Sequence, residues 1–145
     1  MTDILVSKDD GQVVTLTLND APANCLTMEM MSAIKMEIDR VSKSKDHKLV
    51  IFESSNEKIF CSGHSFNEVQ EMIKNNDKKS QELLFAECSE MLMKIRTSPK
   101  IFVAKVRGIA TAGGLGLVSI MDCVFSSKSC LLYTSPSPRD TIRSR

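Results

Sequence analysis

Two glycine-containing turns are the segments of this sequence best suited to chemistry. They are FCSGHSF at residues 60–66 and GIATAGGLG at residues 108–116, each preceded by an apolar run. Loops at the carboxyl ends of parallel strands gather at one edge of a sheet, where ligands bind. Glycine lets the backbone approach a ligand closely, and free amide N–H groups stabilise negative oxygen. Together the turns could supply two convergent donors, which is the arrangement of an oxyanion hole.

Other interpretations of these turns can be weighed by spacing. Composition alone favours two ordinary structural turns, because glycine turns are common. A P-loop is excluded, since Gly114 and Leu115 stand where lysine and a hydroxyl residue are needed. Gly114, Gly116 and Ser119 imitate a dinucleotide motif, but no acidic residue follows about twenty positions later in a strand. A dinucleotide fold is therefore a distant alternative.

Apolar patterns predict the strands that position the turns. Residues 4–7 and 13–18 are expected to form a hairpin that turns at residues 9–11. Further strands are expected at residues 49–52, 101–106 and 122–125, whereas residues 59–64 read as a turn of small residues. Helical patterns separate these runs, so we expect crossover connections between parallel strands.

Three helices are predicted between these strands. Thr27 is the expected N-cap of the first, and Ser65 and Glu68 have the spacing of a capping box that opens the second. The third is expected to be capped near Ser80 and to end before Pro99. The apolar faces are Met30, Ile34, Ile38 and Val41 in the first helix, Phe66, Val69 and Ile73 in the second, and Leu84, Cys88, Met91, Leu92 and Ile95 in the third.

Length and charge limit the class of protein. A chain of 145 residues is long enough for one domain that buries roughly 70% of its unfolded surface. Nineteen Lys and Arg against 18 Asp and Glu give a net charge of +1, so we expect no nucleic-acid partner. No run approaches the roughly 20 apolar residues of a membrane span, and the first residues resemble neither a signal nor a transit peptide. Five cysteines without CxxC spacing and two histidines predict reduced thiols and no metal site.

The segment at residues 128–145 differs in character from the rest. It contains four cations and one anion, whereas residues 1–127 carry a net charge of −2. From Ser129 onward the sequence offers neither an apolar period nor enough large side chains to join a core. We therefore predict a partial domain at residues 1–127 and a disordered, non-native tail at 128–145. The native sequence is expected to stop between about residue 127 and residue 132.

The order of these motifs resembles a known family. A hairpin, NCL at residues 24–26, a helix, a strand, FCSGHSFNE, two helices and VRGIATAGGLGLVSIMDC follow one another. This order is similar to the N-terminal part of the enoyl-CoA hydratase/isomerase, or crotonase, superfamily over residues 3–127. The resemblance implies an α/β fold of β-β-α repeats with a mainly parallel sheet, of which this chain holds the N-terminal portion.

The resemblance also implies a binding site. In the family two backbone amides bind the carbonyl oxygen of an acyl-CoA thioester, and these amides fall on His64 and Gly113. The imidazole of His64 could add to the chemistry, or could be a spectator that packs against the acyl group. No metal and no separate cofactor is implied, since coenzyme A is part of the substrate. The further substrate-binding positions are Asn24, Cys25, Leu26, Ser62, Gly63, Phe66 and Gly114.

The catalytic glutamates of family hydratases are missing from the expected positions. Gly116 stands at the first, and no glutamate follows Glu90. Hydration by paired carboxylates is therefore in doubt. The resemblance implies an acyl-CoA-binding, enoyl-CoA hydratase/isomerase-like protein of fatty acid metabolism, and the alternative is a noncatalytic acyl-CoA-binding or interaction protein. It further implies a mitochondrial location, with a cytoplasmic one as alternative, and a homotrimeric or hexameric full-length parent.

Overall fold

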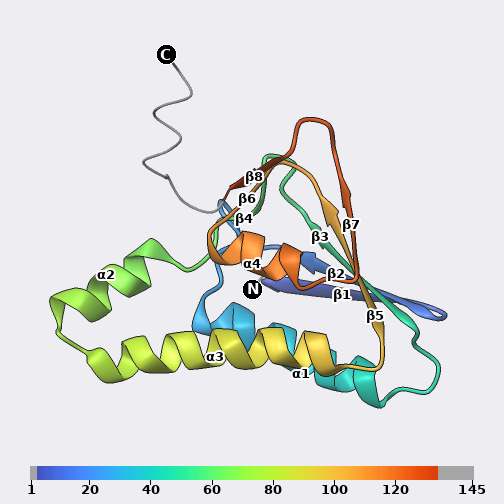
Figure 1. Cartoon of the computed structure of the whole chain (residues 1–145), viewed down its shortest axis with the longest axis horizontal. Helices are drawn as coiled ribbons and strands as arrows, with labels where there is room; N and C mark the ends of the chain where they lie inside the picture. Colours follow the sequence, from blue (N-terminus) through green and yellow to red (C-terminus); the bar gives the residue numbers. More distant parts are fainter. Residues whose placement is uncertain (1–2, 134–145) are drawn as a thin grey trace.

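The computed structural model describes residues 3–133, which form two β-sheets and four helices (Figure 1). A five-stranded sheet has the order β1-β2-β3-β5-β7, and a three-stranded sheet has the order β4-β6-β8. The strands are β1 (Leu5–Asp10), β2 (Val13–Leu18), β3 (Leu49–Ser54), β4 (Ile59–Cys61), β5 (Ile101–Val106), β6 (Ile109–Thr111), β7 (Cys123–Ser126) and β8 (Leu131–Tyr133). The helices are α1 (Met28–Lys43), α2 (Phe66–Lys74), α3 (Lys78–Thr97) and α4 (Gly113–Ser119).

The five-stranded sheet confirms the predicted hairpin and crossovers. Strands β1 and β2 pair antiparallel, whereas β2, β3, β5 and β7 pair parallel to one another. The hairpin turn lies at Gly11 and Gln12 rather than at residues 9–11, because Asp10 still pairs with Val13. The α/β fold with a mainly parallel sheet is thus confirmed.

Helices α1 and α3 pack together and cover the five-stranded sheet (Figure 1). Thr27 is the N-cap of α1, where its side chain accepts a hydrogen bond from the amide of Met30. The predicted apolar face of α1 is buried, and in α3 the predicted stripe is buried except for Leu92, which is half-buried. Lys35 of α1 forms ion pairs with Glu87 and Glu90 of α3, which join the polar sides of the two helices.

Helices α2 and α3 differ from expectation at their starts and surfaces. Ser65 caps α2 as predicted, but no residue of α2 is fully buried, and Phe66 is 74% exposed. The N-cap of α3 is Asp77 rather than Ser80, because the Asp77 carboxylate accepts hydrogen bonds from the amide and hydroxyl of Ser80. The pattern located both helices, but it did not show that α2 would lie at the surface.

The three-stranded sheet is the part of the fold that the sequence patterns missed. Residues 59–61 were predicted as part of a turn, yet they form β4, which pairs parallel with β6. Strand β8 pairs parallel with β6, so the prediction of disorder is wrong for residues 128–133. Three-residue strands carry too little periodicity to be recognised. The rest of the predicted tail lies outside the described residues, and its non-native origin stays a prediction.

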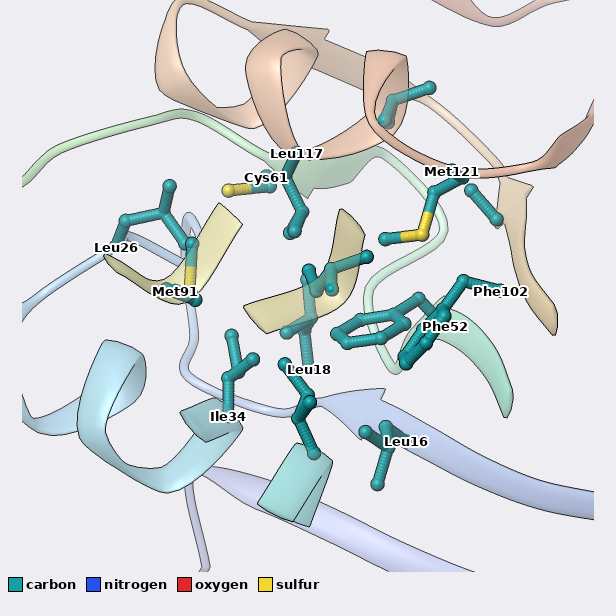
Figure 2. Close-up of a cluster of buried hydrophobic side chains, with 14 of the residues drawn as sticks. Leu16, Leu18, Leu26, Ile34, Phe52, Cys61, Met91, Phe102, Leu117 and Met121 are labelled. Atoms are coloured by element: carbon teal, nitrogen blue, oxygen red, sulfur yellow. The ribbon is translucent and has the colours of Figure 1, made fainter. Parts of the chain in front are cut away.

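One hydrophobic core joins the two sheets. Figure 2 shows Leu117 of α4 and Cys61 of β4 at one end of the buried cluster and Leu16 of β2 at the other. Phe52 and Phe102 of the larger sheet pack with ring centroids 6.4 Å apart. The core thereby fixes the smaller sheet, and the turns that follow its strands, against the larger one. Within residues 3–133 no helix has the length and apolarity needed to cross a membrane.

Candidate active site

The two glycine-containing turns follow neighbouring parallel strands of the smaller sheet. Strand β4 ends at Cys61 and β6 ends at Thr111, and Cys61 pairs with Ala110 in the ladder. Because parallel strands end at the same edge, the segments that follow them lie side by side. The structure thus brings together the two turns that the sequence singled out.

Contact between the turns depends on glycine at two positions. Gly63 has a φ of +88°, and a Cβ there would lie 2.8 Å from the amide nitrogen of Gly113. A Cβ on Gly114 would lie 2.2 Å from the carbonyl oxygen of Cys61. Both distances are shorter than real Cβ contacts, so the turns approach each other as closely as their backbones allow.

The amides of His64 and Gly113 are both unused within residues 3–133. Neither donates a hydrogen bond to a backbone or side-chain acceptor in that range. Gly113 is the first residue of α4, and the first helical bond of α4 runs from the amide of Gly116 to the carbonyl of Ala112 over 3.1 Å. Backbone donors without acceptors cost free energy unless water or a ligand binds them. These two amides are therefore available to a ligand oxygen.

Ala112 is a backbone outlier beside this site. It has φ 49° and ψ −122°, a combination that favours glycine, and it immediately precedes Gly113. A left-handed φ costs an alanine about 1–2 kcal/mol. Strain of this kind is often stored at functional sites. The sequence patterns did not reveal it, although an alanine beside two glycines in a turn is the signal that could have.

The imidazole of His64 lies beside Leu26, Gly113 and Phe85 of α3. Its Nδ1 lies 3.3 Å from the carbonyl oxygen of Leu26, and its ring meets that of Phe85 edge-on, with centroids 5.6 Å apart. A Cβ placed on Gly113 would be 3.6 Å from the Cδ2 of His64. The side chain therefore lies directly beside the second turn. Phe85, an exposed residue of α3, was not among the predicted site residues.

The loop at residues 20–26 holds the first turn in place. The amide of Leu26 donates to the carbonyl of Gly63 over 2.7 Å, and the amide of Ser62 donates to the carbonyl of Ala23 over 3.1 Å. Asn24 is 1% exposed, and its side-chain nitrogen donates to Ser54 Oγ over 2.7 Å and to the carbonyl of Phe60 over 3.2 Å. These bonds occupy the Asn24 amide group, so its visible role is to anchor the loop.

The remaining predicted site residues differ in their burial and in their contacts with the two turns. Leu26 is buried, and its Cδ1 would lie 3.4 Å from a Cβ on Gly113. Cys25 Sγ and Ser62 Oγ are 3.3 Å apart, so these two half-buried groups contact each other. Phe66 is the first residue of α2, and its ring is exposed.

Two ionisable groups beside the turns have shifted pKa values. Burial raises the pKa of the Cys61 thiol to about 12, so Cys61 is a neutral core residue rather than a nucleophile. Burial also raises the pKa of the Glu68 carboxyl, while His64 opposes the shift. One carboxylate oxygen of Glu68 is buried without a hydrogen-bond partner in the described part of the chain. The capping-box spacing pointed to Glu68, but only as a structural residue.

Gly116 faces open space. A Cβ at this position would meet nothing within 4 Å. There is therefore room for a carboxylate side chain at the position where the family resemblance leads us to expect one. The absence of a glutamate there comes from the sequence and not from a lack of room.

The charged hollow elsewhere on the surface is a weaker candidate. It measures about 230 Å³, and its residues are Glu53, Ser54, Ser55, Glu57, Lys105 and Arg107. Its cations are already paired, since Lys105 lies 2.9 Å from Glu53 and Arg107 lies 3.3 Å from Glu57. It contains no residue of the two turns, and ligand pockets are usually larger. Among residues 3–133 there is also no cluster of three potential metal ligands.

Comparisons with known proteins identify the family of the chain. The family model for enoyl-CoA hydratase/isomerase matches residues 8–139. Enoyl-CoA hydratase domain-containing protein 3, mitochondrial, of Rattus norvegicus is 31% identical over 120 residues, which are 83% of this chain and 39% of the relative. The 3-hydroxyisobutyryl-CoA hydrolase, mitochondrial, of Danio rerio is 32% identical over 74% of this chain and 28% of its own length.

Solved structures give the same result. Human enoyl-CoA hydratase domain-containing protein 3 superposes with a TM-score of 0.84 at 25% identity, covering 97% of this chain and 53% of the human one. An enoyl-CoA hydratase of Mycobacterium smegmatis has a TM-score of 0.83 at 30% identity, with 97% and 53% covered. The chain thus spans about half of these solved chains and about two fifths of the rat relative. By sequence and by fold, the chain belongs to the enoyl-CoA hydratase/isomerase family.

Proposed function

We propose that this chain contains the thioester-binding half of an acyl-CoA-binding, enoyl-CoA hydratase/isomerase-like protein of fatty acid metabolism. The thioester oxygen accepts hydrogen bonds from the amides of His64 and Gly113. The observation that carries the proposal is the contact between the two turns, in which Gly63 approaches the amide of Gly113 and both amides lack an acceptor in the described range. Family membership supports the choice of ligand.

The chemistry follows from the charge that develops on the thioester oxygen. Two amides aimed at this oxygen polarise the carbonyl and stabilise an enolate, and each donor of this kind can contribute about 3 kcal/mol. The donors belong to the backbone, so side-chain changes in the turns affect them only through the fold. Leu26 holds the first turn through the carbonyl of Gly63, and Gly114 lets the second turn approach Cys61. We propose that Cys25, Ser62 and Phe66 contact the acyl-CoA. We propose no metal and no cofactor besides coenzyme A in the substrate.

The properties of the whole protein are also proposals. The chain spans less than half of the curated relatives it matches. The names of those relatives contain the word mitochondrial, which supports a mitochondrial location for this protein. A homotrimeric or hexameric parent is proposed from the family resemblance, and sedimentation of the full-length protein would test it.

The test compares two ligands that differ by one carbonyl oxygen. Butyryl-CoA has a thioester carbonyl group, whereas S-butyl-CoA has a methylene in place of that carbonyl. If two amides bind this oxygen, the thioether should bind about 10- to 100-fold more weakly to the 145-residue chain in isothermal titration. Free coenzyme A controls for binding of the nucleotide portion. Equal affinity for thioester and thioether would contradict the proposal.

Noncatalytic binding is the second candidate function, and Gly116 favours it. The position that holds a glutamate in family hydratases has no side chain here, although a Cβ would meet nothing within 4 Å. We expect Gly116→Glu to gain hydration of crotonyl-CoA if a missing carboxylate is what limits the site. Gly116→Gln, which has similar volume and no charge, is the matched control. An unchanged rate in Gly116→Glu would show that one carboxylate does not restore hydration.

A further inference from the structure

The imidazole of His64 lies beside Gly113, whose amide the proposed function assigns to the thioester oxygen. Its Cδ2 faces Gly113 at 3.6 Å from the position of a Cβ on that residue. The ring is half-buried between the second turn and Phe85 of α3. The carbon next to a thioester carbonyl lies one bond from the carbonyl carbon, so a side chain beside the amides is within reach of it. This position allows the ring a role in proton transfer as well as in packing.

Two contacts fix the orientation and the proton of this ring. A carbonyl oxygen only accepts hydrogen bonds, so the contact of Nδ1 with the carbonyl of Leu26 at 3.3 Å places the proton on Nδ1. In the neutral ring Nε2 then holds a lone pair. The edge-on contact with Phe85 at an interplanar angle of 82° restricts rotation of the ring. A base oriented by two neighbours is the arrangement that proton transfer requires.

The second ring nitrogen is free and accessible. Nε2 has no hydrogen-bond partner within residues 3–133. The fully buried polar atoms without a partner in this range are His47 Nδ1 and one oxygen of Glu68, so Nε2 of His64 is not fully buried. It is bonded to Cδ2, the atom that faces Gly113, so it lies on the side of the ring near the second turn. Glu68 lies in the first turn of α2, four residues after His64.

We propose that Nε2 of His64 is the acid–base group of this site and transfers the proton on the carbon next to the thioester carbonyl. This inference rests on the proposed function, because it needs the thioester oxygen at the two amides. The C–H bond breaks, its electron pair forms the carbon–carbon double bond of an enolate, and the proton bonds to Nε2. The reverse step returns a proton to carbon. The step needs no oxidant or second substrate, and it supplies the acid–base group that the missing glutamate at position 116 does not.

The test is deuterium exchange into butyryl-CoA in heavy water, followed by mass spectrometry with the full 145-residue chain. We expect His64→Gln to lower the exchange rate at least about 100-fold, the usual size of a general-base effect. The glutamine keeps the backbone amide and an N–H group that can donate to Leu26. His47→Gln is the matched control, since His47 is the other of the two histidines and pairs with Asp9 at 3.4 Å. We expect the control to exchange at the original rate.

A second variant separates a lost base from a damaged fold. His64→Ala leaves a space, and added imidazole should restore exchange in that variant without changing the rate of the original chain. Exchange that survives His64→Gln, or bound butyryl-CoA that does not exchange in the original chain, would overturn the inference and leave the binding proposal intact. Failure of the original chain to prefer butyryl-CoA over S-butyl-CoA would overturn both.

Discussion

The two turns of the candidate site contact each other, but a different residue type has the positive φ angle in each. The first turn places a glycine, Gly63, at φ +88°, whereas the second places an alanine, Ala112, at φ 49°. A Cβ on Gly63 would collide with the second turn, but the methyl group of Ala112 is exposed. Available space, more than backbone conformation, thus decides which of these positions requires glycine. Gly63 is limited by packing, whereas Ala112 carries backbone strain without a packing conflict.

The clearest way to break the contact between the turns is a methyl group on Gly114. Its Cβ would lie 2.2 Å from the carbonyl oxygen of Cys61. A backbone atom in a sheet cannot shift without weakening the pairing of its strand. We expect Gly114→Ala to lower the free energy of unfolding by about 3 kcal/mol, the upper end of overpacking effects. Thermal unfolding followed by circular dichroism measures this change. Gly116→Ala, in the same helix and facing open space, should cost nothing.

Gly63→Ala should have the next largest effect. The added Cβ would lie 2.8 Å from the amide nitrogen of Gly113 and 3.1 Å from the Cβ of Ala112, at a φ that alanine disfavours. We expect a loss of about 2 kcal/mol, together with weaker binding of butyryl-CoA, because the second amide must shift. Gly11→Ala is the control, since Gly11 has φ +59° and no neighbour within 4 Å. An equal loss in both variants would show that backbone conformation, and not contact, makes Gly63 necessary.

The sequence predicted the turns but not how they meet. Helix caps at Thr27 and Ser65 and the parallel strands of the larger sheet followed from local patterns, because periodicity and capping act over a few residues. The smaller sheet did not, since β4 and β6 have three residues each and are held by pairing across the chain. The assignment of His64 and Gly113 as site positions came from the family resemblance and stays a prediction. The strain at Ala112 and the contact of His64 with Phe85 depend on tertiary packing and needed coordinates.

Ala112→Gly should act in the opposite direction and more weakly. Glycine relieves about 1–2 kcal/mol of backbone strain at a left-handed φ, but it adds about 0.4–1 kcal/mol of freedom to the unfolded chain. We therefore expect a net gain of about 0.5–1 kcal/mol, seen as a rise of about 2 °C in the melting temperature. A lower melting temperature would mean that Ala112 makes contacts that outweigh its strain. Such a result would remove the distinction between a packing-limited Gly63 and a strained Ala112.

The smallest effect concerns the carboxylate of Glu68, which follows the first turn in α2. Burial raises the pKa of Glu68 above its ordinary value of 4.5, so the folded chain binds a proton there more tightly than the unfolded chain does. The cost of the charged form is present above the raised pKa and disappears as the pH falls below 4.5. Glu68→Gln should therefore raise the melting temperature at pH 7, and its advantage should shrink as the pH falls to 4. Glu71→Gln, an exposed residue of the same helix, is the control for loss of charge alone. If both variants show the same pH dependence, the buried oxygen of Glu68 does not distinguish the first turn.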